Sequence, residues 1–296
     1  MKKTLLVTSL LALLQGCSGM KYTPMTQETR DAVKTTQAYN LVIQDEARPA
    51  VELSNASGAL GGGLIAAAID SSINDDRALG AFGVAAPLLN STLDVNFRKL
   101  IVEEMNPVLV SEFNASSAEQ AEARLLRDKD VKAKITQLKE GEAFLYLSTF
   151  YQFHDDFKVL QFETVANLYI AKEGKRSATK PDYRNTFTYI SDQVGTGSVN
   201  SINLWNENNA ALYRSTIKDS LTQIRKMLEA DIKVEKNEAC LGGTKYHTFN
   251  VLGKVHAKGT VISKENNRVL LRNKNGALVH TTNDLLGKPV KKLCGA

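Results

Sequence analysis

The chain has 296 residues, with 37 basic and 32 acidic side chains, and 43% of its residues are hydrophobic. A chain of this size and composition can bury one good core and a smaller satellite. Beyond residue 16, no run approaches the about 18 consecutive apolar residues of a transmembrane helix, so we expect a body without membrane spans.

The first sixteen residues have the parts of a secretory signal peptide. Lys2 and Lys3 form its positive start, and a mostly apolar run of eleven residues follows over 4–14. Eleven helical residues reach only about 16 Å, roughly half of a hydrocarbon core of about 30 Å. The run is therefore too short to be a permanent span, and we predict that residues 1–16 are removed.

The next four residues, Leu14-Gln15-Gly16-Cys17, resemble the lipobox of bacterial lipoproteins, although Gln15 departs from the more usual Ala or Ser. The resemblance covers only these residues and the signal. It implies cleavage before Cys17, a diacylglycerol on its thiol and, in Gram-negative bacteria, a third acyl chain on its amine. Two or three acyl chains anchor a protein stably where one binds marginally. The alternative is an ordinary signal peptide cleaved near Gly19, with Cys17 lost.

The residues after Cys17 bear on where the body works. Position 18 is Ser rather than Asp, which in enterobacteria-like sorting implies the outer membrane, facing the periplasm. Residues 17–38 are polar and predict a flexible tether of about twenty residues, whose ends lie about 25 Å apart on average. We therefore expect the body to lie close to the membrane surface.

Residues 39–235 predict an α+β domain, an antiparallel sheet with helices packed on it. Residues 39–46 are a candidate first strand. Residues 58–89 hold two apolar runs separated by a polar patch at 70–77, and their Gly and Ala residues stack at helical spacing. We expect a small-residue helix packed tightly against the sheet, with a hairpin that dips into the leaflet as the alternative.

Two further helices are expected before the central strands. An apolar stripe at helical spacing over 93–105 predicts an amphipathic helix, which Ser91 or Thr92 can cap. Ser117 followed by Gln120 forms a capping box for a short helix through Leu126.

From Glu142 the hydrophobic period changes to two. Residues 144–153 and 158–170 predict an antiparallel hairpin at the centre of the sheet, and 185–193 predict a third strand. An amphipathic pattern over 208–232 predicts a long helix.

Residues 236–296 predict a small basic β module that resembles an SH3-like barrel. The last 57 residues hold ten basic and two acidic side chains. Short strands are expected at 246–252, 259–263, 268–272 and 277–281. Cys240 and Cys294 predict a disulfide in an oxidising compartment, which would contribute roughly 4 kcal/mol by closing a loop of about 55 residues. A metal pair or two free thiols are the alternatives.

The charge of this module predicts an anionic partner, because a basic patch speeds the approach of anions. The candidate binding residues are Lys254, Lys258, Arg268, Arg272, Lys291 and Lys292. A periplasmic address excludes nucleic acid and leaves anionic lipid, peptidoglycan or an acidic protein surface. The alternative is that the basic charge offsets the acidic balance of the preceding domain and docks the two together.

No recognised catalytic motif is present: there is no G-x-S-x-G, no H-E-x-x-H and no phosphate-binding loop. Residues 195–198 are predicted to be a flexible turn, because they lack the lysine of a phosphate site. Neither the polar turn at 154–156 nor the three histidines of the module have the spacing of metal ligands. We predict no catalytic residue, no metal and no cofactor.

These patterns favour a non-enzymatic outer-membrane lipoprotein that acts as an envelope adaptor or scaffold. The alternative is a carrier of a small apolar ligand or lipid, in the manner of the auxiliary lipoproteins of envelope transporters, which the order of elements resembles. A pocket lined by Leu64, Ile65, Phe144 or Phe162 would favour the carrier. A filled core with an exposed patch would favour the adaptor.

Overall fold

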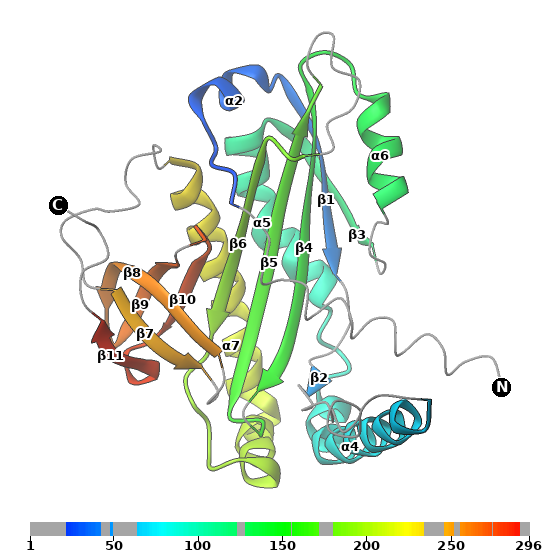
Figure 1. The fold of residues 1–296 in the computed structure, drawn as a ribbon. Coiled ribbons are helices and arrows are strands. Elements are labelled where there is room, and N and C mark those ends of the chain that lie inside the picture. The colour runs from blue at the N-terminus through cyan, green and yellow to red at the C-terminus, as the bar shows by residue number, and fades with distance from the viewer. Residues whose placement is uncertain are drawn as a thin grey trace.

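The computed structural model in Figure 1 describes residues 22–42, 48–49, 64–122, 128–154, 156–171, 180–233, 246–251, 255–273 and 275–290. The helices are α2 (Gln27–Ala32), α4 (Leu64–Ser91), α5 (Phe97–Phe113), α6 (Asp128–Gln137) and α7 (Ser198–Lys233), with a 3-10 turn η3 (Asn283–Leu285). The strands are β1 (Thr35–Val42), β2 (Arg48–Pro49), β3 (Ala115–Glu122), β4 (Glu142–His154), β5 (Val159–Ile170), β6 (Tyr183–Ile190), β7 (Tyr246–Val251), β8 (Val255–Glu265), β9 (Arg268–Asn273), β10 (Leu278–Thr282) and β11 (Leu286–Val290).

The strands form one sheet in the order β11-β7-β8-β9-β10-β6-β5-β4-β1-β3, with β2 paired to β4. Helices α5 and α7 cross one face of its centre, and α6 lies at its other face (Figure 1). This arrangement confirms the predicted α+β class. The sheet is mixed rather than antiparallel, because helical connections return the chain to the same end, so that β1 pairs in parallel with both β3 and β4.

The central hairpin forms where the alternating pattern predicts it. Strands β4 and β5 pair antiparallel from Ala143 opposite Ile170 to His154 opposite Val159, and β6 pairs antiparallel with β5. Side chains on one face of these strands pack under α5 and α7 in the main core. On the other face, α6 covers one end and strands of the C-terminal region cover the other.

The predicted tether is wrong for residues 22–38, which are folded. Thr23 pairs with Arg184 at the end of β6 through two backbone hydrogen bonds of 3.0 and 2.9 Å. The side chain of Met25 is 3% exposed, and Thr26 caps α2 by accepting from the backbone of Thr29. Although this segment is mostly polar, its apolar side chains Met25 and Val33 pack in the main core.

Helix α4 is one helix of 28 residues that runs through the polar patch predicted to separate two runs. Its C-terminal part packs on α7, where Ala85 and Leu88 are fully buried, whereas Leu79 is 70% exposed. The helix projects from the body (Figure 1) and does not pack tightly on the sheet as predicted. Among the described residues, no helix is long and apolar enough to cross a membrane.

Two other sequence predictions are wrong. Because α4 continues through Ser91, the next helix begins later, and its N-cap is Asn96 rather than Ser91 or Thr92. The segment with the capping box is not a helix but strand β3, which follows the left-handed C-cap Asn114. Pairing with the edge of β1 outweighs the local helix propensity of this segment.

The four strands predicted in the C-terminal region are present as β7 to β10, and β11 adds a fifth. They are not a separate layer, because β10 runs parallel to β6, with Leu278 opposite Phe187, and so continues the sheet of the body. The structure does not confirm an SH3-like barrel. The signal segment, Cys17, Cys240 and Cys294 lie outside the described residues.

Candidate functional site

The predicted anion-binding residue Arg272 is instead buried, with only 8% of its surface exposed. Its Nη1 donates to Asp231 Oδ1 at 2.7 Å and to the carbonyl oxygen of Gly276 at 3.0 Å. The second oxygen of Asp231 accepts from Tyr183 Oη at 2.9 Å and from Asn185 Nδ2 at 2.8 Å. The prediction of an exposed site is therefore wrong for Arg272, because the basic charge of β9 is used to neutralise a buried carboxylate of α7.

Arg268 also faces the body. It pairs with Asp192 at 3.1 Å, donates to the carbonyl oxygen of Ile190 at 2.9 Å and lies over the ring of Tyr189, 4.6 Å from its centroid. For Arg268 and Arg272, the structure therefore supports the docking alternative rather than an external anion. Lys254, Lys291 and Lys292 and the side chain of Lys258 lie outside the described part of the chain.

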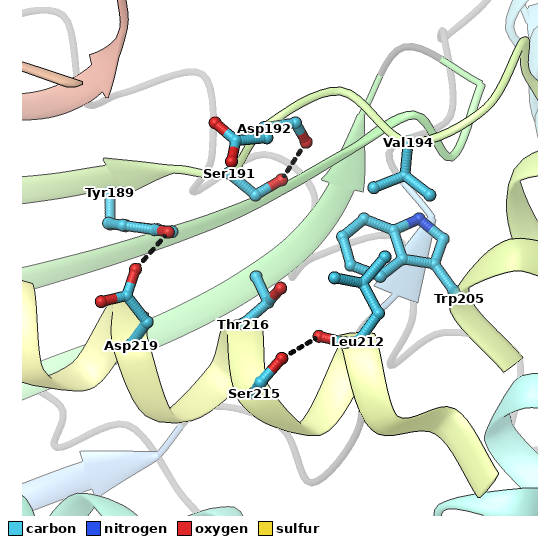
Figure 2. Close-up of a pocket in the computed structure, with 9 residues that line it drawn as sticks. All are labelled: Tyr189, Ser191, Asp192, Val194, Trp205, Leu212, Ser215, Thr216 and Asp219. Carbon is cyan, nitrogen blue, oxygen red and sulfur yellow. Dashed lines mark hydrogen bonds between the residues drawn. The ribbon is translucent and has the colours of Figure 1, made fainter. Parts of the chain in front are cut away.

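Close to Arg268, a pocket of about 200 Å³ opens between α7 and the loop that follows β6 (Figure 2). Its lining residues are Tyr189, Ser191, Asp192, Val194, Trp205, Leu212, Ser215, Thr216 and Asp219. The floor is the indole of Trp205, which is fully buried and donates Nε1–H to the carbonyl oxygen of Phe157 at 2.8 Å. The rim includes the side chain of Leu212, which is 44% exposed. The pocket thus has an accessible apolar edge and lies above a rigid, buried aromatic ring.

One end of the pocket is acidic. Asp219 accepts a 2.7 Å hydrogen bond from Tyr189 Oη (Figure 2). It also accepts a 3.1 Å hydrogen bond from Gln223 Nε2. Burial, together with the carboxylate of Asp219, raises the pKa of Tyr189, so this phenol remains a donor at neutral pH. Asp192 lies at the rim with its side chain 75% exposed. Since Asp192 is paired with Arg268, the carboxylate of Asp219 makes the pocket suited to a cationic or hydrogen-bond-donating group.

His280 lies behind this acidic end. Its ring centroid is 5.7 Å from that of Tyr189, and its Nδ1 lies 3.4 Å from Arg268 Nη2. Burial first, and then the charge of Arg268, lowers the pKa of His280 to about 4. His280 is therefore neutral at physiological pH and does not offset the charge of Asp219.

The loop beside the pocket is the turn predicted at 195–198. Gly195 and Gly197 have φ values of +71° and +115°, which favour glycine. The amides of Thr196 and Gly197 donate to the side chains of Asn200 and Ser201, both at 2.9 Å. Because these amides already have acceptors, the turn is not arranged as a phosphate cradle.

Helix α7 is interrupted on the other side of Trp205. Asn208, Asn209 and Ala210 are left-handed, with φ of 52°, 58° and 57°. A left-handed conformation costs roughly 1–2 kcal/mol for an ordinary residue, and Asn tolerates it best. The turn joins two helical segments so that Leu212 of the second lies beside Trp205 of the first (Figure 2). The sequence predicts a helix that begins at residue 208, at this break, but does not predict that a helical segment precedes it in α7; the pair Asn208-Asn209 is a local signal of the turn.

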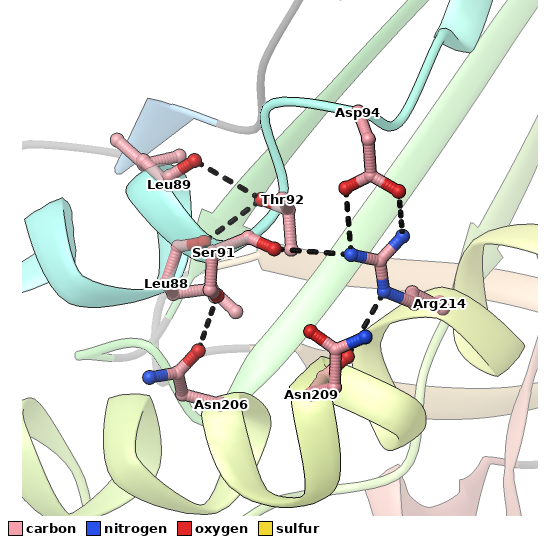
Figure 3. A network of polar contacts seen from close by, with 8 residues as sticks. All are labelled: Leu88, Leu89, Ser91, Thr92, Asp94, Asn206, Asn209 and Arg214. Carbon is pink, nitrogen blue, oxygen red and sulfur yellow. Dashed lines mark hydrogen bonds and ion pairs between the residues drawn. The ribbon is translucent and has the colours of Figure 1, made fainter.

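Arg214 holds this left-handed turn (Figure 3). Its Nε donates to the carbonyl oxygen of Asn209 at 3.0 Å, and its Nη2 donates to that of Ser91 at 3.0 Å. Its two terminal nitrogens also bind both oxygens of Asp94, at 2.8 and 2.7 Å. The hydrogen bond from Arg214 lowers the pKa of Asp94. The end of α4 and the turn that shapes the pocket are thus tied to one side chain.

Two of the residues proposed to line a carrier pocket, Phe144 and Phe162, do not line one pocket. Phe144 and Phe162 are both fully buried, but Phe144 packs with α6 and Phe162 packs in the main core on the opposite face of the sheet. The side chains of Leu64 and Ile65 lie outside the described residues. On the α6 face, burial raises the pKa of Glu163 to about 7.

Within the described part of the chain, no three His, Cys, Asp or Glu side chains lie close enough together to hold a metal ion. When the chain is compared with known protein families, curated proteins and solved structures, it matches none of them.

Proposed function

We propose that this chain is a non-enzymatic outer-membrane lipoprotein, anchored by lipid on Cys17, that acts as an adaptor for a protein partner. The observation that carries the proposal is the pocket over Trp205. It is open, small and acidic at one end, with the exposed Leu212 at its rim, whereas the core around it is filled with apolar side chains. A side chain of the partner that fills such a pocket is a common form of protein-binding hot spot.

The folded N-terminal segment supports a position close to the membrane. Tyr22 packs against Gly276, and its ring lies over the guanidinium of Arg272, 5.7 Å from the centroid. An extended chain spans at most about 3.6 Å per residue, so the five steps from Cys17 to Tyr22 reach about 18 Å. An adaptor on so short a connection meets partners at the membrane surface itself.

The basic C-terminal region forms the second part of the proposal, a contact with peptidoglycan or anionic lipid. Two of its arginines are bound internally, so this contact falls to Lys254, Lys258, Lys291 and Lys292. A Lys291→Ala/Lys292→Ala variant should sediment less with purified peptidoglycan or with anionic vesicles than the unmodified chain. A truncation before Cys240 is a poorer test, because it removes Arg272 and leaves Asp231 buried without its cation. Equal retention of the lysine variant and the unmodified chain would contradict this contact.

The adaptor role is tested by crosslinking in intact cells. A photoreactive amino acid at Leu212 should capture a partner protein, because this side chain stands at the rim of the pocket. The matched control is Val110 on α5, which is exposed to a similar extent, 46% against 44%, and should capture much less. Equal capture at the two positions, or none at Leu212, would count against the pocket as the partner site.

The anchor is tested separately. Cys17→Ser should abolish incorporation of labelled palmitate and release the chain from the membrane fraction, because the thiol is the acceptor of the diacylglycerol. Retention of the label in this variant would overturn the lipoprotein assignment.

A further inference from the structure

We propose that the pocket over Trp205 takes a lysine side chain of the partner protein, with an apolar neighbour of that lysine resting on Leu212. The inference rests on the proposed adaptor function and names the chemistry of the partner. Four features carry it: the size of the pocket, its uncompensated charge, the geometry of the acceptors on Asp219 and its apolar walls.

The size of the pocket fits one side chain. Its volume of about 200 Å³ corresponds to roughly seven water molecules at about 30 Å³ each. Pockets for drug-sized ligands occupy about 300–1,000 Å³. A single long side chain can therefore fill the space, whereas most of a lipid chain or a nucleotide would lie outside it.

The charge of the pocket favours a cation. Arg268 offsets the charge of Asp192, to which it is paired at 3.1 Å. No ion pair joins Asp219 to any of the described basic residues, and its two hydrogen bonds come from the neutral groups of Tyr189 and Gln223. His280 behind it is neutral. The negative charge of Asp219 is therefore left for a ligand to neutralise.

The hydrogen bonds of Asp219 favour lysine over arginine. Tyr189 already occupies Oδ2, and Gln223 occupies Oδ1. A guanidinium binds a carboxylate best with two parallel hydrogen bonds, which would require both oxygens at one edge. An ammonium group needs only one of the remaining lone pairs. The hydroxyl of Thr216, which also lines the pocket, is a second acceptor within the same space.

The walls of the pocket suit the stem of a lysine. Val194 and Leu212 present apolar surface between the rim and Asp219 (Figure 2), and the buried ring of Trp205 lies beneath them. A lysine buries its four methylene groups along apolar surface while its charge stays with a polar partner. The same wall at Leu212 continues to the outside, where the next apolar residue of the partner would rest.

The test uses the purified full chain, whose single tryptophan lies buried beneath the pocket. The probes are the capped peptides acetyl-Leu-Lys-Leu-amide, acetyl-Leu-Arg-Leu-amide and acetyl-Leu-norleucine-Leu-amide, titrated while the fluorescence of Trp205 is recorded. The lysine peptide should bind at least about tenfold more tightly than the norleucine peptide, because the charge-assisted hydrogen bond is missing from the latter, and more tightly than the arginine peptide.

Asp219→Asn keeps the shape of the pocket and removes the charge of this side chain. It should weaken the binding of the lysine peptide by about tenfold and leave the affinity for the norleucine peptide unchanged. The matched control, Asp76→Asn, changes an exposed carboxylate on α4 and should change neither. Equal binding of the lysine and norleucine peptides would overturn the lysine assignment, as would binding that Asp219→Asn leaves intact.

The failure of this inference can be told apart from failure of the proposed function. If Leu212 captures a partner in cells and Asp219→Asn does not reduce that capture, the lysine assignment is overturned and the adaptor stands. If Leu212 captures nothing, the pocket is not the partner site and both fail. Loss of capture in Asp219→Asn but not in Asp76→Asn supports both.

Discussion

The two ends of α7 differ in the burial and pairing of their acidic side chains. At the sealed end, residues 220–233, Asp231 is 0% exposed and holds Arg272, Tyr183 and Asn185. At the pocket end, residues 198–219, Asp219 is exposed and no ion pair with a described residue neutralises it. The backbone differs as well, because the left-handed turn interrupts only the pocket end.

This difference separates a structural role from a binding role. A buried ion pair is costly to form and very costly to break, so it fixes one register between β9 and α7. The left-handed turn, the open pocket and the carboxylate of Asp219 do not add stability. Features of this kind are typical of binding surfaces. The contrast predicts that equivalent substitutions at the two ends have unequal effects.

The largest effect is expected from Asp231→Asn. It leaves the charge of Arg272 buried without a counter-ion, which should lower the free energy of unfolding by about 3–5 kcal/mol. Asp219→Asn at the pocket end should change it by less than about 1 kcal/mol. Urea unfolding of both variants measures the difference. The double variant Asp231→Asn/Arg272→Met removes both charges and keeps an acceptor for Tyr183 and Asn185, so it should recover part of the stability. Equal losses at the two aspartates would refute the contrast.

The next effect concerns pH and His280. Its pKa is about 4 when folded, against an ordinary value of 6.5, so the unfolded chain takes up the proton first. Its contribution to stability is therefore present above pH 6.5 and is lost as the pH falls toward 4. We expect a loss of about 1–2 kcal/mol, since partial exposure screens the full effect.

The measurement is the difference in urea stability between the wild type and His280→Phe, taken at pH 7 and at pH 4. Because both proteins contain the other titrating groups, the contributions of those groups to the pH dependence cancel. Glu163 is one of them, and its raised pKa favours the folded state as the pH falls. A difference that is the same at both pH values would show that His280 does not titrate as described.

A smaller effect is expected from Arg214→Ala. The side chain is partly exposed, yet it satisfies two carbonyl groups and Asp94 at once. Its removal should lower the free energy of unfolding by about 1 kcal/mol and speed hydrogen exchange in residues 206–210. Lys99→Ala, which breaks an exposed pair with Glu103, is the control and should change stability by less than about 0.5 kcal/mol. Unchanged hydrogen exchange in residues 206–210 would show that Arg214 does not hold the turn.

The smallest effects are expected from two asparagines of α7, whose replacement by alanine should change the stability in opposite directions. Asn208→Ala places alanine in a left-handed residue and should cost about 1 kcal/mol. Asn203 is exposed within the regular first segment, so Asn203→Ala should stabilise by about 0.5 kcal/mol. Thermal or urea unfolding of the pair tests whether the turn exists, since two stabilising results would mean a continuous helix.

Much of the sheet could be predicted, because alternation of apolar residues is a local property of the chain. The hairpin of β4 and β5 and strands β7 to β10 were anticipated in this way. The left-handed turn in α7 could not be predicted, because the pattern indicates only the helix after it, and the contacts of Arg214 with the distant Ser91 and Asp94 are tertiary. Asp219 and Trp205 were likewise unremarkable in sequence, since a charged residue on a helix and a buried tryptophan are both ordinary.

The amino-acid sequence by itself determined the α+β class, the positions of the central and C-terminal strands and the excess of basic charge in the last 57 residues. Only the tertiary structure decided how that charge is used. Arg268 and Arg272 turn inward because β10 pairs with β6, which brings β9 over the acidic side chains of α7 and its loop. Strand pairing between distant segments is not a local property. No pattern along the chain could therefore reveal that Arg268 and Arg272 bind Asp192 and Asp231 of the body.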